Sequence, residues 1–224
     1  MSIEERINDL EDLFDRNYNA DAAIQISKYF RNQFESFGLK NAHRRALSKP
    51  FTDSFKKDSV QTISDAVRAL WHKPQREFQH VGMELLDRYR KYFGPEITDI
   101  LVFEITHKSW WDSVDFIASH TVGWAYANGR LHKQDIQHWN GSEDIWLIRS
   151  SIIFQLKYKN QTDWDFLQQM IIPHLPHSDF FIRKAIGWAL REYGKSEPQR
   201  VLAFVESNEM SGLSQREAIR RLVN

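Results

Sequence analysis

The sequence contains no cysteine. This absence excludes disulfide bonds, metal sites built on thiolate ligands and any cysteine nucleophile. The chain also has no excess of either charge, because Lys plus Arg and Asp plus Glu each number 30. It is therefore not a general polycation, and a contact with nucleic acid would require basic residues gathered on one surface.

Long apolar runs and flexible linkers are missing as well. No apolar run approaches the length of a membrane span. Because no Gly-, Ser- or Pro-rich linker interrupts the 224 residues, we expect a single domain, residues 1–224, with a sizeable core. The start of the chain, residues 1–6, is too acidic for a secretory signal, which predicts a protein of the cytoplasm, in a bacterium the cytosol or nucleoid.

Several families of active site have no counterpart in the sequence. There is no Gly-rich loop to hold phosphates, no dinucleotide fingerprint and no Ser-His-Asp order. His174 and His177 are close in sequence, but Pro176 lies between them and a third ligand is missing. We therefore predict neither a metal site nor a cofactor.

Aromatic residues are plentiful, with 8 Trp and 15 Phe, and apolar residues recur at helical spacing along the chain. The pattern predicts helices at residues 3–15, 21–36, 59–71, 75–92 and 96–107, with a short basic helix at 41–47 before Pro50. Gly38 is expected to end the second helix. No sustained alternation predicts a strand, so the expected class is all-α.

An internal repeat organises the second half of the chain. The segments 78–86, 148–156 and 182–190 share one pattern, and Gln79, Val114, Arg149 and Arg183 fall at equivalent positions, spaced by 35, 35 and 34 residues. N-cap candidates precede the last two segments, namely Asp144 and either Asp179 or Ser178. This period predicts an α-solenoid of antiparallel helix pairs, of the HEAT-like kind, with a concave surface.

The segment 109–116 combines two adjacent tryptophans with two carboxylates. In a helix Trp111 and Asp115 share one face, and we expect Trp110 and Asp112 to point elsewhere. Asp115 lies within an apolar stretch, where an unpaired carboxylate would be costly to bury, so it is a site candidate. The alternative is that Asp112 only complements the helix dipole and that both tryptophans belong to the core.

The repeat register brings further residues to the same zone. Asp115, Ser150 and Lys184 are equivalent, and Trp111, Arg149 and Trp188 come from different helices at similar depth. Structural alternatives remain open for these groups, because an arginine such as Arg149 commonly pairs with a neighbouring aspartate and Trp188 could be a core residue.

Several strings resemble the AlkD family of alkylpurine DNA glycosylases. These are residues 108–115, 144–149, 154–159, 184–193 and 213–219, and the similarity runs from about residue 4 to the end. The resemblance implies that Asp115 is the catalytic carboxylate and that Trp111 and Trp188 hold the deoxyribose of the lesion. It also implies that Arg149 contacts the DNA backbone and that Tyr29, on the helix at 21–36, faces the DNA.

The implied activity is hydrolysis of the N-glycosidic bond of N3-methyladenine or N7-methylguanine in duplex DNA, as in base excision repair, with the damaged base left stacked. Such a base is cationic and leaves readily, so the enzyme needs mainly to stabilise positive charge on the sugar. A carboxylate in an aromatic slot can do this and can also orient the attacking water. Tryptophan faces would favour the cationic sugar.

The expected partner is double-stranded DNA with alkylated bases, bound by a monomer without a membrane or cofactor. Affinity would come mostly from phosphate contacts. The candidates are Arg44, Arg45, Lys108, Arg149, Lys157, Lys159, Arg183, Lys184, Arg191, Arg216 and Arg220. The alternative function is a non-catalytic HEAT-like module that binds damaged or branched DNA, or a protein partner.

Overall fold

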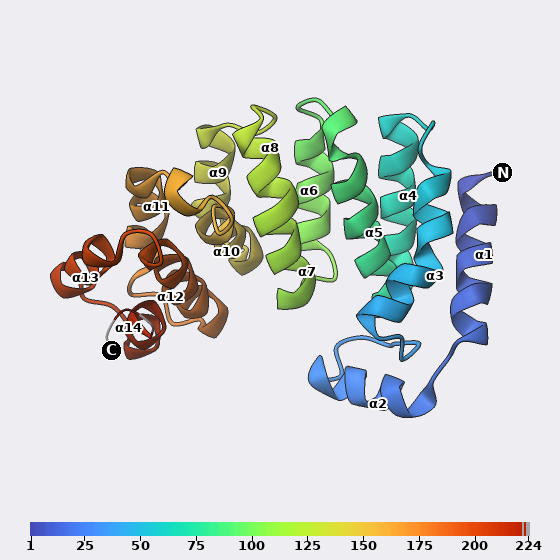
Figure 1. Cartoon of the computed structure of the whole chain (residues 1–224), viewed down its shortest axis with the longest axis horizontal. Helices are drawn as coiled ribbons and strands as arrows, with labels where there is room; N and C mark the ends of the chain where they lie inside the picture. The colour runs from blue at the N-terminus through green and yellow to red at the C-terminus, as the bar shows by residue number, and fades with distance from the viewer. Residues whose placement is uncertain (221, 223–224) are drawn as a thin grey trace. The chain divides into compact units, whose positions relative to one another are not determined.

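The computed structural model describes residues 1–220 and 222. Within this part of the chain the regular structure is helical, apart from one isolated β-bridge between Glu35 and Gln75. The all-α class predicted from the sequence is therefore confirmed (Figure 1). None of the helices among these residues is long and apolar enough to cross a membrane. The backbone forms two compact units, Met1–Phe93 and Gly94–Asn224.

The first unit is built around a cluster of phenylalanine rings. Phe14, Phe37 and Phe78 lie with their ring centroids 5.6 Å apart in all three pairs. Helix α1 packs on α3 and α4, and α5 packs on the same two helices. The helices of this unit are α1 (Ile3–Arg16), α2 (Ala20–Tyr29), α3 (Asn41–Ser54), α4 (Val60–His72), α5 (Arg76–Tyr89) and the 3-10 turn η1 (Arg90–Tyr92).

Helix α2 is shorter than the sequence pattern indicates, since it ends at Tyr29 and not near residue 36. The two residues that follow Phe30, Arg31 and Asn32, have φ angles of 55° and 57°, which end the helix. The loop beyond them is pinned by Glu77, whose Oε1 accepts bonds from Ser36 Oγ at 2.6 Å and Leu39 N at 3.2 Å. This long-range contact overrides the local helical pattern.

Gly38 lies in that loop and does not cap a helix. Its φ is 79°, and a Cβ at this position would lie 2.2 Å from the backbone oxygen of Asn19. Only glycine therefore lets the loop pass this close to the start of α2. A second difference concerns Pro50, which lies inside α3 and does not follow a short helix. Phe51 and Phe55 anchor the helix beyond Pro50 because both rings are buried.

Helix α10 is the centre of the second unit. It packs against α6, α7, η2, α9, α11 and α12, and α12 in turn packs against α13 and α14. The elements are α6 (Ile97–Thr106), α7 (Trp111–Phe116), the π-helix η2 (Ile117–Val122), α8 (Gly123–Ala127), α9 (Lys133–Asn140) and α10 (Ile145–Ile153). They continue with η3 (Lys159–Gln161), α11 (Trp164–Ile171), η4 (Ile172–His174), α12 (Phe180–Gly194), α13 (Pro198–Ser207) and α14 (Gly212–Ile219).

The repeat predicted from the sequence corresponds to equivalent places in the four helices α5, α7, α10 and α12. Gln79, Val114 and Arg183 are the fourth residues of α5, α7 and α12, and Arg149 is the fifth residue of α10. The chain thus has a helical repeat fold, in which one residue position recurs at nearly the same depth in four helices.

Two of these helices begin at the predicted aspartates. Asp144 Oδ1 accepts bonds from the backbone N–H groups of Trp146 and Leu147, at 2.8 and 3.2 Å. Asp179 Oδ1 accepts from the equivalent groups of α12, at 2.7 and 3.2 Å. An aspartate cap of this kind stabilises a helix by about 1 kcal/mol. The caps fix the residues at which α10 and α12 start. They therefore also fix the positions along the helix axis of the side chains in the first turns.

Candidate active site

Asp115 lies in a helix that changes its type immediately afterwards. Helices α7 and α8 are joined through η2, so one continuous helix runs from Trp111 to Ala127 with a π-helical middle. The side chain of Ser119 donates to the backbone oxygen of Asp115 at 2.7 Å. π-helical turns are rare and occur frequently at functional sites. The carboxylate therefore lies at the start of an unusual stretch of backbone.

The Asp115 carboxylate is held by Arg149. Arg149 Nε donates to Oδ1 at 2.7 Å, and Nη2 donates to Oδ2 at 2.9 Å. The exposed fractions of the two side chains are 17% for Asp115 and 5% for Arg149. Nη1, the remaining guanidinium nitrogen, donates to the backbone oxygen of Phe181 at 2.5 Å. Arg149 thus ties α7 to α10 and to the first turn of α12.

This environment shifts the titration of the carboxylate. Burial raises the pKa of Asp115, and the bonds and positive charge of Arg149 only partly oppose the effect. The negative charge of Asp112 raises the pKa of Asp115 further. These surroundings disfavour the ionised form of the carboxylate, so a cation placed beside its exposed part would stabilise that form. Such a perturbed carboxylate is typical of an active site. Asp112 therefore acts electrostatically on the site, from about one helical turn before Asp115.

An aromatic cluster lies next to the ion pair. The ring centroids of Trp110 and Trp146 are 5.9 Å apart, and those of Trp146 and Phe181 are 4.8 Å apart. Trp110 and Phe181 complete the triangle at 5.4 Å. Because the backbone of Phe181 also accepts the bond from Arg149 Nη1, the cluster helps to fix the guanidinium.

Sequence reasoning did not identify Trp146 and Phe181, although a signal was present. Trp110, Trp146 and Phe181 are spaced by 36 and 35 residues, which is close to the repeat period. Comparing aromatic residues between repeats would have indicated a shared wall in the first turns of α7, α10 and α12.

The two candidate sugar-binding tryptophans are on different helices of the second unit. Trp111 is the first residue of α7, and Trp188 lies in the second half of α12. Both side chains are only partly buried, unlike Trp71, which is 1% exposed in the core of the first unit. Trp188 also lines an open pocket of about 260 Å³ with Arg191, Glu192, Lys195 and Arg220. Both tryptophans therefore have surface available for a ligand.

Two predicted cations of α12 share one carboxylate. Lys184 Nζ lies 3.0 Å from Glu217 Oε1, and Arg191 is paired with Oε2 of the same group. Burial favours the neutral acid, but the bonds from Lys184 and Arg191 outweigh it and lower the pKa of Glu217. Arg183 is half-buried, and its Nε donates to Asp179 O at 3.4 Å.

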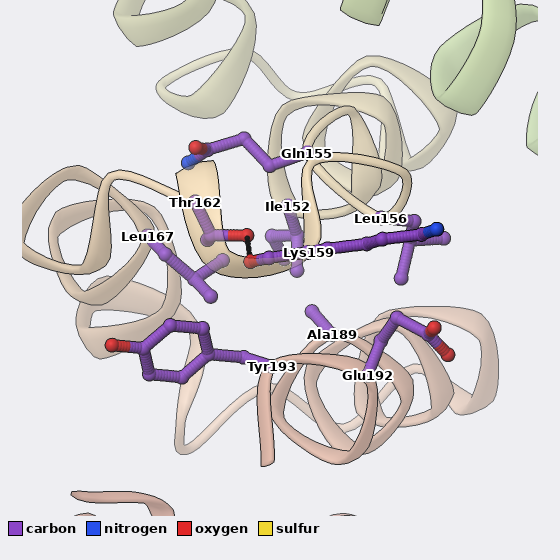
Figure 2. Close-up of a pocket in the computed structure, with 9 residues that line it drawn as sticks. All are labelled: Ile152, Gln155, Leu156, Lys159, Thr162, Leu167, Ala189, Glu192 and Tyr193. Atoms are coloured by element: carbon purple, nitrogen blue, oxygen red, sulfur yellow. Dashed lines mark hydrogen bonds between the residues drawn. The ribbon is translucent and has the colours of Figure 1, made fainter. Parts of the chain in front are cut away.

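The other candidate phosphate contacts in this unit differ in exposure. Lys157 is exposed and bonded to His120 Nε2, whereas Lys108 is half-buried. Lys159 is exposed, and Figure 2 shows it at the wall of a small void of about 10 Å³ between α10, α11 and α12. There Thr162 Oγ1 donates to the Lys159 carbonyl at 2.8 Å. Arg216 and Arg220 are exposed.

The predicted site residues of the first unit lie on α2 and α3. Tyr29 ends α2 with 66% of its surface exposed, and its ring lies 5.3 Å from that of Phe30. Arg45 is exposed and pairs with Glu84. Arg44 is only 1% exposed and donates to both oxygens of the Glu84 carboxylate, at 2.8 and 2.7 Å.

The predicted phosphate contacts of Arg44 and Arg149 do not fit these positions. Arg149 is 4% exposed, and the guanidinium groups of both residues bond to carboxylates of the protein. The structural alternative for Arg149, pairing with a neighbouring aspartate, is the one observed. Among residues 1–220 and 222, no group of three or more His, Asp or Glu side chains is arranged to hold a metal ion.

Comparisons with known proteins agree with this architecture. Residues 10–222 match the family model of DNA alkylation repair enzymes. The chain is also similar to a solved structure, a predicted DNA alkylation repair enzyme from Enterococcus faecalis. The identity is 29%, the TM-score is 0.85, and the match covers 92% of this chain and 97% of that chain. A search of curated proteins gives no significant match. The chain belongs to the family of DNA alkylation repair enzymes.

Proposed function

We propose that this member of the family is a DNA glycosylase that hydrolyses the N-glycosidic bond of cationic alkylated purines in duplex DNA. Its substrates would be N3-methyladenine and N7-methylguanine, and the damaged base would stay stacked. The observation that carries the proposal is Asp115, a partly exposed carboxylate whose pKa is raised by burial and whose orientation is fixed by Arg149. Such a group is suited to stabilise a cation in front of it.

The chemistry needs no acid at the leaving group. When the bond between C1′ and the purine nitrogen breaks, its electron pair neutralises the positive charge of the alkylated base. The positive charge then remains on the sugar, where the Asp115 carboxylate stabilises it. A water molecule attacks C1′ and loses a proton, and Asp115 can orient this water and receive the proton. Trp111 and Trp188 would contact the deoxyribose through their π faces.

Arg149 has a positioning role in this scheme. Its two bonds hold both oxygens of Asp115, and its positive charge opposes the rise in the pKa of the carboxylate. Arg149 therefore favours the anionic form of Asp115 in surroundings that favour the acid. The same two bonds also reduce the electrostatic stabilisation that the carboxylate can give to a sugar cation. The pairing therefore favours ionisation of Asp115 but weakens its effect on the sugar.

A second function remains open because of that pairing. If Arg149 occupies the carboxylate permanently, the chain would be a non-catalytic module that binds damaged or branched DNA, or a protein partner. The proposed catalysis instead requires that one face of the Asp115 carboxylate stays accessible. Its exposed fraction of 17% favours the catalytic role.

The deciding experiment is a single-turnover assay. Protein in excess would be mixed with a duplex that carries one N7-methylguanine, and the released free base would be quantified against a reaction without protein. Release well above the spontaneous rate supports the glycosylase. Tight binding of the duplex without release would favour the binding module.

A further inference from the structure

A lysine and a histidine form a pair beside the candidate active site. His120 belongs to η2, and its Nε2 accepts a bond from Nζ of Lys157, which lies between α10 and η3. His120 follows Asp115 by five residues on one continuous helix. At roughly 1.5 Å per residue this separation is about 7.5 Å along the axis. The pair therefore lies about two nucleotide steps of a DNA strand from Asp115, at roughly 3.4 Å per step.

The ring of His120 is oriented by its own helix. Nδ1 lies 3.1 Å from the backbone oxygen of Phe116, which can only accept a bond, so Nδ1 carries the hydrogen and donates it. The ring also stacks on that of Phe116, with the centroids 4.1 Å apart and the planes at 15°. Nε2 consequently keeps a lone pair, which faces the Lys157 ammonium group.

The segment that carries Lys157 is fixed against the same helix. The hydroxyl of Tyr158 donates to the backbone oxygen of Gly123 at 2.5 Å. A Cβ on Gly123 would lie 2.5 Å from the backbone oxygen of Phe154, so only glycine allows this close approach. The chain on both sides of Lys157 is thus in place before a ligand binds, while the side chain of Lys157 is exposed.

This arrangement is typical of an activated amine nucleophile. A lysine attacks a carbonyl carbon only as the neutral amine, and a neighbouring base makes that form available. Such sites combine the nucleophile, a base within hydrogen-bond reach and a third group that orients the base. Lys157, His120 and the backbone oxygen of Phe116 form such a series.

We propose that Lys157 is a nucleophile for the aldehyde of an abasic site, with His120 as its base, and that the protein cleaves the strand there by β-elimination. The substrate of this step rests on the proposed function, because excision of a base leaves a deoxyribose that opens to an aldehyde at C1′. A phosphate contact would use only the charge of Lys157, whereas this reaction uses its amine.

The reaction balances without a further reagent. His120 Nε2 takes a proton from the Lys157 ammonium, the amine adds to C1′, and His120 returns the proton as water leaves, which gives an iminium ion. Neutral His120 then removes a proton from C2′. The electrons of that C–H bond form the C2′–C3′ double bond, and the bond from C3′ to the phosphate oxygen breaks. Water hydrolyses the iminium ion, which releases the sugar aldehyde and restores the Lys157 ammonium, and His120 gives its proton to the solvent.

Reductive trapping tests the amine directly. The substrate would be a duplex with one preformed abasic site, which bypasses base excision. Sodium borohydride reduces the iminium ion to a stable covalent link between protein and DNA. Without borohydride the strand should be cut and the next nucleotide should carry a 5′-phosphate. Wild type should give both products well above a reaction without protein, and absence of either product would overturn the proposal.

Lys157→Arg separates the nucleophile from a phosphate contact. Arginine keeps the positive charge but forms no iminium ion, because its guanidinium stays protonated. Trapping and cutting should disappear, while affinity for undamaged duplex should fall far less. The matched control is Lys133→Arg, which changes an exposed lysine of α9 that pairs with Asp163 and not with a histidine. Trapping that persists in Lys157→Arg, or an equal loss in both variants, would refute Lys157 as the nucleophile.

His120→Gln tests the base. Glutamine can still accept a bond from Lys157 but cannot take up its proton, so we expect the rate of trapping to fall roughly a hundredfold. Circular dichroism would show that the variant remains folded, and an unchanged rate would refute the role of His120.

A parallel assay of N7-methylguanine release separates this proposal from the proposed function. If wild type cuts and traps the abasic duplex but releases no base, the proposed function fails and the cleavage activity stands. Release of the base without trapping would have the opposite meaning.

Discussion

Arg149 Nε lies 2.7 Å from Asp115 Oδ1, and the two residues are 34 positions apart, one residue short of the repeat that separates Val114 from Arg149. The pair is therefore a product of the repeat itself, because residues at similar depth in α7 and α10 are placed side by side. A carboxylate from one repeat and a guanidinium from the next form a unit that neither helix could build alone.

Asp115→Asn should abolish most of the excision activity. The amide keeps the volume of the carboxylate but deletes the charge that, in the proposed mechanism, stabilises the sugar cation, so we expect a loss of roughly two orders of magnitude or more in single-turnover rate. Binding of undamaged duplex should change little. Asp165→Asn, an exposed aspartate in the first turn of α11, is the matched control. A variant that kept its rate would remove Asp115 from the mechanism.

The same substitution should change how stability depends on pH. Since the pKa of Asp115 is raised in the folded state, its contribution to stability is fully present below the ordinary aspartate pKa of about 3.9. That contribution is lost as the pH rises through the raised pKa. The melting temperature of Asp115→Asn should therefore improve relative to wild type as the pH rises from about 4 toward neutrality. A constant difference would mean that the folded and unfolded pKa values are equal.

Arg149→Met should shift the pH profile of excision. Arg149 opposes the rise in the pKa of Asp115, so its removal should raise that pKa further. The anionic carboxylate is then lost at higher pH, and the variant should lose more of its rate at about pH 6 than at about pH 8, after subtraction of spontaneous base loss. A loss of the same factor at every pH would indicate that Arg149 supports only the packing of α7, α10 and α12.

Trp111→Ala and Trp188→Ala should each reduce excision more than they reduce binding of undamaged duplex. Both rings would act on the sugar as it becomes positively charged, an interaction that is stronger in the transition state than in the bound duplex. Single-turnover rates and dissociation constants measured on the same preparations decide the matter. Parallel losses in both quantities would mark the tryptophans as structural.

Gly187→Ala should destabilise the protein by about 2 kcal/mol or more, although alanine favours a helix by about 1 kcal/mol over glycine. The new Cβ would lie 2.5 Å from Glu217 Cβ and 2.9 Å from the backbone oxygen of Ser214, so α14 would have to move. Gly212→Ala is the control, because its nearest atom is the flexible end of Arg216 at 3.2 Å. Thermal unfolding of the two variants measures the difference. Similar melting temperatures would show that α14 adapts without cost.

The repeat period and the helical patterns were sufficient to predict the fold class and the cap at Asp144, whereas the cap of α12 stayed open between Asp179 and Ser178. Both depend on residues close in sequence. The partner of Arg44 could not be predicted, and pairing of Arg149 with an aspartate was only one open alternative, because spacing gives the position of a side chain along its helix but not its direction. The early end of α2 is also a long-range effect, since Glu77 pins the loop that follows it.

The π-helical turns of η2 change the angle around the helix axis between the residues before and after them. Asp115 bonds to Arg149 of α10. Eight residues later, the backbone oxygen of Gly123 accepts a bond at 2.5 Å from the hydroxyl of Tyr158, a residue that lies just beyond the end of α10. In a plain α-helix eight residues leave two positions roughly 80° apart. A π turn takes up about one extra residue and brings them nearly into line. The direction of the Asp115 carboxylate relative to α10 therefore depends on the number of residues in η2 as well as on their identity.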